Sequence, residues 1–164
     1  MNLYLICHAN PTEQDENIED NQRTLTEKGR KKLGQIARSL EKLDLKFDVI
    51  FTSPYLYARQ TANVVAEALD IKKKCVVDSD NLTPLGSAEK LVEEINTRES
   101  LANLLIVGHA PFLSQLIGML LAGDASLGID IKKAGLCKLS LDQLTYGRCS
   151  RLGWLLTPGQ LTAI

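Results

Sequence analysis

The sequence lacks a basic cluster and a long hydrophobic run, and each absence excludes a class of protein. Lysine and arginine are nowhere denser than at residues 72–74, and the formal net charge is −1, so the chain has no electrostatic footprint for nucleic acid. The apolar run at residues 1–6 is too short for a signal-peptide core and has no basic leader. The run at residues 101–107 is interrupted by Asn103. We therefore expect no nucleic-acid partner, no export and no membrane insertion.

The sequence also lacks a Cys-x-x-Cys pair. Its four cysteines, Cys7, Cys75, Cys137 and Cys149, are scattered along the chain, so neither a zinc knuckle nor a redox dithiol is indicated. Unpaired cysteines suit a reducing compartment, and we expect a cytoplasmic protein. Cys75 and Cys137 lie in apolar runs and are expected to be small buried hydrophobic residues.

No internal repeat, low-complexity tract or Pro/Gly/Ser-rich linker divides the chain. The 164 residues, of which 45% are apolar and 24% charged, have the length and composition of one globular domain. We therefore predict a single domain over residues 1–164.

Short apolar runs alternate with segments of helical periodicity. Strands are expected at residues 3–7, 48–52, 75–77 and 104–107, and a final pair with antiparallel character at 135–141 and 151–157. Helices are expected at 27–43 with Thr26 as N-cap, from Ser53-Pro54 onward, after the N-cap Ser87, and from the 108–111 segment to about Leu121. This alternation predicts an α/β fold, a three-layer α/β/α sandwich whose central sheet is mainly parallel with an antiparallel edge.

Only two histidines are present, and each follows directly on a buried apolar strand. His8 comes after the first strand and His109 comes two residues after Val107. In open α/β sheets, ligands bind beyond the carboxyl ends of the strands, which is where both histidines are expected. A ring placed there can turn one nitrogen toward a ligand while a carbonyl or side chain fixes the other. The alternative is that each histidine only fills the end of a strand.

The residues around the histidines resemble the histidine phosphatase superfamily, which has a phosphoglycerate mutase-like fold. Residues 3–9 (Leu-Tyr-Leu-Ile-Cys-His-Ala) are similar to its opening strand and Arg-His-Gly signature. The other matching blocks are residues 23–29, Thr52-Ser53-Pro54 with residues 58–62, residues 107–111 and residues 132–135. Their order and spacing, together with the small size, resemble the SixA-type phosphohistidine phosphatases in particular.

This resemblance implies phosphoryl transfer without a metal or organic cofactor. His8 would attack phosphorus and carry a phosphohistidine intermediate that water hydrolyses, while His109 and the backbone N–H groups near Ala110 would bind the transferring oxygens. The implied substrate is a phosphorylated protein, such as a histidine phosphotransfer domain in signal transduction, or a small phosphate ester.

The sequence departs from the family pattern at three positions. Cys7 replaces the arginine before the first histidine, Ala9 replaces the following glycine, and Tyr57 replaces the second phosphate-binding arginine. Neither a thiol nor a phenol substitutes for a permanently charged bidentate group. Arg23 and the Tyr57 hydroxyl are candidates for binding phosphate instead, whereas Arg59 is expected to form a surface ion pair.

Two functions of different class remain open. The first is a weak or altered phosphatase that uses His8 and His109. The second is a pseudophosphatase, a catalytically inactive binding or regulatory module. A sugar-phosphate mutase is disfavoured because the chain is too short for the inserted segments of such enzymes, and the carboxylates of Glu13, Asp15 and Glu16 are better explained as a solvated loop. A cysteine nucleophile at Cys7 is excluded because position 13, where such a loop needs arginine, is glutamate.

Overall fold

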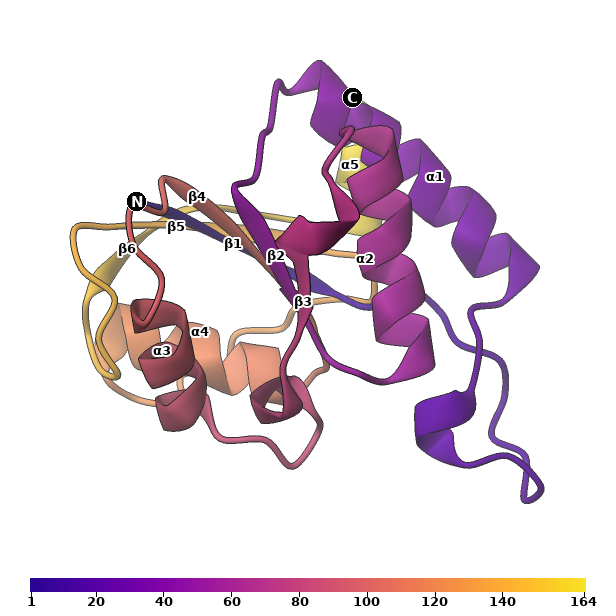
Figure 1. Ribbon diagram of the computed structural model, residues 1–164, viewed down its shortest axis with the longest axis horizontal. Coiled ribbons are helices and arrows are strands. Elements are labelled where there is room, and N and C mark those ends of the chain that lie inside the picture. The colour runs from indigo at the N-terminus through magenta and orange to yellow at the C-terminus, as the bar shows by residue number, and fades with distance from the viewer.

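The computed structural model describes residues 1–164 and contains one six-stranded sheet flanked by helices (Figure 1). The strands are β1 (Asn2–Cys7), β2 (Val49–Thr52), β3 (Val76–Asp78), β4 (Asn103–Gly108), β5 (Leu136–Leu141) and β6 (Ser150–Leu156). Their order in the sheet is β3-β2-β4-β1-β5-β6. The first four strands in that order run parallel to one another, and β5 and β6 pair antiparallel. The predicted α/β class with an antiparallel edge is confirmed.

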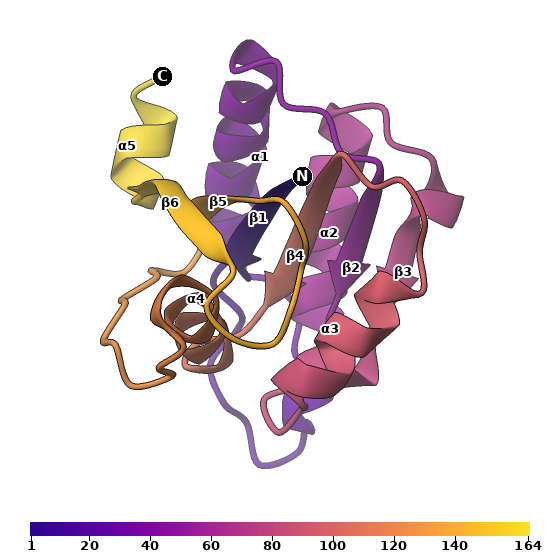
Figure 2. The ribbon, with the colours of Figure 1, turned by 90° about the vertical axis from the view of Figure 1, so that its left-hand side faces the viewer.

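Helices cover both faces of the sheet. They are α1 (Glu27–Lys42), α2 (Leu56–Ala68), α3 (Ala88–Asn96), α4 (Phe112–Ala122) and α5 (Pro158–Thr162). Figures 1 and 2 show α1 and α2 on one side and α3 and α4 on the other. Each face of the sheet has its own apolar core, and alternate residues of β1 point into one or the other. Leu3 and Leu5 pack toward α3 and α4, whereas Tyr4 and Ile6 pack toward α1, α2 and α5.

The register of the two central strands determines where the histidines lie. β1 and β4 are parallel neighbours in which Cys7 is paired with Gly108, the last residue of each strand. The backbone N–H of His8 then donates to the carbonyl of Gly108 at 2.9 Å. Both histidines therefore leave the sheet side by side at its carboxyl edge, as expected for an open parallel sheet.

The starts of α1 and α3 follow from local capping, whereas the start of α2 differs from the prediction. The Thr26 hydroxyl accepts from the backbone N–H of Gly29 at 2.9 Å, and the Ser87 hydroxyl accepts from that of Lys90 at 3.3 Å. The second helix, however, begins at Leu56 rather than at Ser53-Pro54. Ser53 and Pro54 form the turn that leads from β2 into α2, so the Ser53 side chain is free to act at the sheet edge.

Three other details depart from the sequence expectations. Cys137 is fully buried as predicted, but Cys75 is only partly buried because it ends a short 3-10 helix, Lys73–Cys75, before β3. The apolar run of residues 152–156 favours a core strand, but β6 is an edge strand with Leu152 half-exposed. The short helix α5 was not anticipated. No helix in the structure has the length and apolar character needed to cross a bilayer.

Candidate active site

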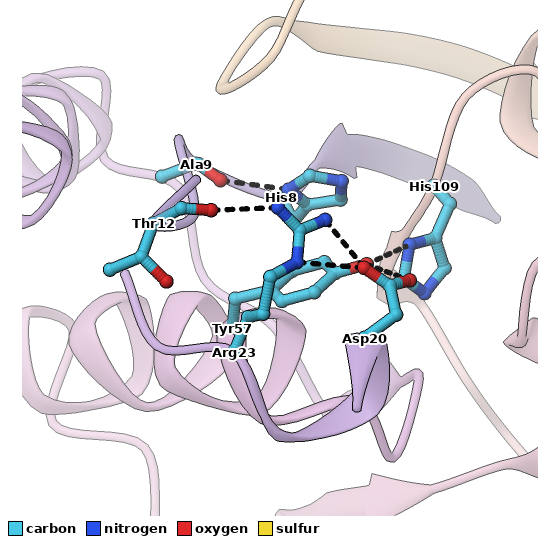
Figure 3. Close-up of polar contacts among 7 residues, drawn as sticks. All are labelled: His8, Ala9, Thr12, Asp20, Arg23, Tyr57 and His109. Atoms are coloured by element: carbon cyan, nitrogen blue, oxygen red, sulfur yellow. Dashed lines mark hydrogen bonds and ion pairs between the residues drawn. The ribbon is translucent and has the colours of Figure 1, made fainter. Parts of the chain in front are cut away.

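His8 and His109 face each other at the carboxyl edge of β1 and β4 (Figure 3). Their ring centroids lie 5.1 Å apart with an interplanar angle of 60°. Both side chains are largely shielded from solvent, His8 at 7% and His109 at 3% exposure. The structure therefore brings together the two residues on which the sequence analysis depends, within reach of one phosphate-sized group.

The protonation of His8 follows from its partner. Nδ1 of His8 lies 2.7 Å from the carbonyl oxygen of Ala9, which can only accept, so Nδ1 carries the proton and Nε2 keeps its lone pair. Thr61 fixes this segment, since its hydroxyl accepts from the backbone N–H of Ala9 at 3.1 Å and donates to the carbonyl of Tyr57 at 2.8 Å. The side chain of His8 thus presents an unprotonated Nε2, the form that a nucleophilic imidazole needs.

Burial lowers the pKa of both rings. The pKa of His8 falls to about 4, mainly because burial disfavours the imidazolium, and the positive charges of Lys133 and Arg23 lower it further. The pKa of His109 also falls to about 4, through burial first and then the proximity of His8. The hydrogen bond to Ala9 and the negative charge of Asp20 oppose part of these shifts. Both imidazoles are neutral at pH 7.

Two hydroxyls hold His109. Its Nε2 lies 2.7 Å from the hydroxyl of Ser53, and its Nδ1 lies 3.5 Å from the hydroxyl of Tyr57. The Tyr57 hydroxyl donates to Asp20, so its oxygen is left to accept. This arrangement favours a proton on Nδ1 of His109 and an acceptor at Nε2 that takes the Ser53 proton. The N–H of His109 is then directed toward the Tyr57 hydroxyl.

Tyr57 fills the position that the missing second arginine would occupy. Its ring lies 4.4 Å from that of His8 and 5.5 Å from that of His109, centroid to centroid, and the side chain is buried. The hydroxyl donates to the Oδ2 of Asp20 at 3.3 Å. Burial and the carboxylate of Asp20 raise the pKa of Tyr57, so the phenol keeps its proton and remains a hydrogen-bond donor.

Arg23 reaches the site but its guanidinium is already paired. Its Nε donates to Oδ1 of Asp20 at 2.7 Å, and its Nη1 donates to the carbonyl of Thr12 at 2.7 Å. The guanidinium carbon lies 5.4 Å from the centroid of the Tyr57 ring. Arg23 is therefore a cation close to the two histidines, and its charge is balanced by Asp20.

Of the two other predicted site residues, Cys7 is buried in the core and Ala110 is exposed. Cys7 is buried in the apolar core between the sheet and helices α3 and α4, and this burial raises the pKa of its thiol. Ala110, directly after His109, is exposed at the start of the segment that leads into α4.

A turn at Lys132–Gly135 covers the end of β1, since the backbone N–H of Ala134 donates to the carbonyls of Cys7 at 2.9 Å and His8 at 3.2 Å. Lys133 in this turn is exposed.

The remaining charged residues that the sequence singled out do not form the site. Glu13, Asp15 and Glu16 are exposed on the loop before the 3-10 helix Asp20–Gln22. Arg59 pairs with Asp78 at 3.3 Å on the surface, as predicted. The acidic residue that does enter the site, Asp20, was missed. Its three-residue spacing from Arg23 was the available signal, because such a spacing is typical of an ion pair on one helical turn.

The main surface cavities, with volumes of about 220 to 440 Å³, are lined by neither histidine. No group of three or more His, Cys, Asp or Glu side chains is arranged to hold a metal ion. The space between the histidines is instead bordered by Tyr57, Arg23 and Asp20 (Figure 3).

Replacing Ser53 with alanine is expected to release the tautomer of His109, because Nε2 loses its buried hydroxyl partner and the ring loses the contact that favours a proton on Nδ1. 15N NMR of the imidazole measures the tautomer. Ser39→Ala is the matched control, since it removes a buried serine hydroxyl that donates only to the carbonyl of Gln35 within α1. A His109 spectrum that is the same in the two variants would contradict this role of Ser53.

Comparison with known proteins shows the family and the fold of the chain. Residues 3–81 match the family described as the histidine phosphatase superfamily (branch 1). An uncharacterised protein of Picosynechococcus is 33% identical over 141 residues, which cover 85% of this chain and 84% of the relative. The structure of the protein histidine phosphatase SixA complexed with tungstate is similar with a TM-score of 0.85 and 22% identity, covering 98% of this chain and 99% of SixA. Phosphoserine phosphatase from Entamoeba histolytica, in complex with 3-phosphoglyceric acid, is similar with a TM-score of 0.70 and 16% identity, covering 98% of each chain. The chain belongs to the histidine phosphatase superfamily and has the fold of its SixA-type branch.

Proposed function

We propose that the chain is a SixA-like phosphoprotein phosphatase that transfers a phosphoryl group to Nε2 of His8 and then to water. The observation that carries this proposal is that Nε2 of His8 is unprotonated, because Nδ1 donates to the carbonyl of Ala9. The ring of His8 also lies beside that of His109. A nucleophilic imidazole must be neutral, and the low pKa of His8 keeps its ring neutral at physiological pH.

In the first step, Nε2 of His8 would form a bond to phosphorus as the bond from phosphorus to the leaving nitrogen or oxygen breaks. The leaving group takes a proton from solvent. The N–H of His109, the hydroxyl of Tyr57 and the guanidinium of Arg23 are the donors placed to neutralise the transferring oxygens. In the second step, water attacks phosphorus, the bond to Nε2 breaks, and inorganic phosphate and a proton are released.

The preferred substrate in this proposal is a phosphohistidine protein, such as a histidine phosphotransfer domain in signal transduction. A phosphoramidate needs little help from a general acid, and Asp20 is the one carboxylate whose charge acts on the pKa of the two rings. Small phosphate esters are the alternative substrates. Four free cysteines suit the cytoplasm as the compartment of action.

Brief exposure to a radioactive phosphoramidate donor is expected to leave an acid-labile, alkali-stable label on His8. His8→Ala should abolish the label, because the other unprotonated imidazole nitrogen, Nε2 of His109, already accepts the Ser53 hydroxyl. Arg59→Gln is the control, since Arg59 pairs on the surface with Asp78 and should label normally. Absence of label and of turnover with phosphohistidine protein, acetyl phosphate and aryl phosphates would contradict the proposed function.

One observation favours the second candidate, a pseudophosphatase that binds a partner. The donors around the histidines are already occupied by the carboxylate of Asp20, and two arginines of the family pattern are absent. A binding module should capture its partner equally well after His8→Ala. Turnover that disappears in this variant would count against a binding module.

A further inference from the structure

Two of the donors available for a phosphoryl oxygen, Arg23 and Tyr57, are hydrogen-bonded to one side chain, that of Asp20. Arg23 donates to Oδ1 of Asp20 at 2.7 Å, and Tyr57 donates to Oδ2 at 3.3 Å. Nδ1 of His109 lies 3.5 Å from the same Tyr57 hydroxyl. Figure 3 shows the carboxylate of Asp20 between the guanidinium and the His109 ring. The two negatively charged carboxylate oxygens of Asp20 thus occupy the donors of Arg23 and Tyr57 that a phosphoryl oxygen would use.

Asp20 is held less firmly than Tyr57 and His109. Tyr57 and His109 come from the core, at 3% exposure each, whereas the Asp20 side chain is 40% exposed. The 3-10 helix that carries it, Asp20–Gln22, buries no residue and begins without a side-chain cap. A carboxylate on such a segment can leave the site through solvent while Tyr57 and His109 stay in place.

A phosphoryl group and Asp20 require the same partners. Oxygens of both are charged acceptors, and Arg23 and Tyr57 are hydrogen-bonded to Asp20 in the structure. If Asp20 stayed while a phosphoryl group bound, two anions would lie within a few ångströms, which disfavours binding. The two anions therefore compete for one set of donors.

We propose that Asp20 is an internal anion that competes with phosphoryl groups for Arg23 and Tyr57 and thereby selects phosphoproteins over free phosphate and small esters. A small ester offers little beyond its phosphate, so it must displace Asp20 unaided. A phosphorylated protein adds contacts of its own around the site. The inference rests on the proposed function only in taking a phosphoryl group as the ligand of this pocket; it does not require turnover.

Asp20→Asn and Asp20→Ala are expected to tighten the binding of inorganic phosphate about ten- to a hundredfold, the range of one or two charge-assisted contacts regained by the ligand. Isothermal titration with inorganic phosphate measures the dissociation constants. Glu16→Gln is the matched control, because Glu16 is exposed on the same loop and its loss removes the same charge. Its affinity should stay within about twofold of the natural protein, since an exposed charge is screened by salt.

The double variant Asp20→Asn with Arg23→Gln should lose most of the gain, because the released cation is then missing. An unchanged or weaker affinity in both single variants, with the thermal midpoint retained, would overturn the inference. So would a gain that persists without Arg23. If phosphate binds more tightly after Asp20→Asn while His8 is never labelled, the proposed function fails and the role of Asp20 stands.

Discussion

The double variant Cys7→Arg and Tyr57→Arg is expected to hydrolyse aryl phosphates at least about a hundredfold faster than the natural protein, judged by kcat/KM. Removal of one donor that stabilises transition-state charge commonly costs about 10²–10³ in rate, and this chain lacks two of the arginines found in the family pattern. Its single guanidinium at the site, that of Arg23, is balanced by Asp20.

The two substitutions meet different obstacles, which are neutralisation by Asp20 at position 57 and core packing at position 7. Tyr57 lies against both histidine rings, so an arginine there would direct its guanidinium into the site. Part of its charge would be neutralised by Asp20, and the single Tyr57→Arg variant should therefore show a smaller gain than the double variant. Cys7 is fully enclosed by the core that includes Leu113, so a longer side chain at position 7 must push its charged end toward the pocket or disturb the packing.

Asn63→Arg is the control for this prediction. Asn63 is exposed on α2, the helix that carries Tyr57, so the substitution adds the same charge away from the histidines. It should leave kcat/KM unchanged. If Tyr57→Arg alone and the double variant both remain at the natural rate while their thermal midpoints are retained, missing charge is not what limits the reaction.

The sequence predicted the sheet edge well because the relevant signals are local. The runs at 3–7 and 104–107 are short, apolar and unbroken, which is typical of strands buried on both faces, and each is followed by a histidine. Parallel neighbours then bring their carboxyl ends together. The adjacency of β1 and β4 in the sheet, which the two runs do not specify, is what places His8 beside His109.

The contents of the site could not be predicted in the same way. Asp20 is 37 residues from Tyr57, and the contact between them depends on how an aperiodic polar loop folds back over α2. Ser53 acts on His109 only because the helix begins later than its proline suggested. Such contacts arise from the tertiary arrangement of turns, for which hydrophobic periodicity carries no information.

The end of the chain shows a signal that was present but overlooked. Thr157 and Gln160 form a capping box, with Pro158 at the first helical position, and these three residues define α5. The apolar run before it favours a core strand. β6 instead forms an edge of the sheet, where a bulge next to Lys138 breaks the register and Leu152 is half-exposed although it is paired with the buried Leu139.

The two histidines are expected to titrate near pH 4 rather than near 6.5, and this keeps both rings partly unprotonated in acid, where an ordinary imidazole is almost fully protonated. Burial is the main cause for both rings. At pH 4 a histidine with a pKa of about 4 is half neutral, so its neutral fraction exceeds that of an unperturbed histidine more than about a hundredfold. 15N NMR of the imidazoles measures both titrations directly, because the chain contains only two histidines.

The same shift makes the folded state sensitive to acid, and the sign follows from proton binding. The unfolded chain takes up protons on both histidines below about pH 6.5, while the folded chain does so only near pH 4, so the free energy of unfolding falls as the pH drops through this interval. The loss is on the order of 3 kcal/mol for each histidine. The variant His8→Gln with His109→Gln lacks these two groups but keeps every carboxylate, so its thermal midpoint should fall less steeply between pH 6.5 and 4. Parallel curves for the two proteins, or imidazole resonances that titrate near pH 6.5, would show that the rings are open to water and that His8 is not held neutral by burial.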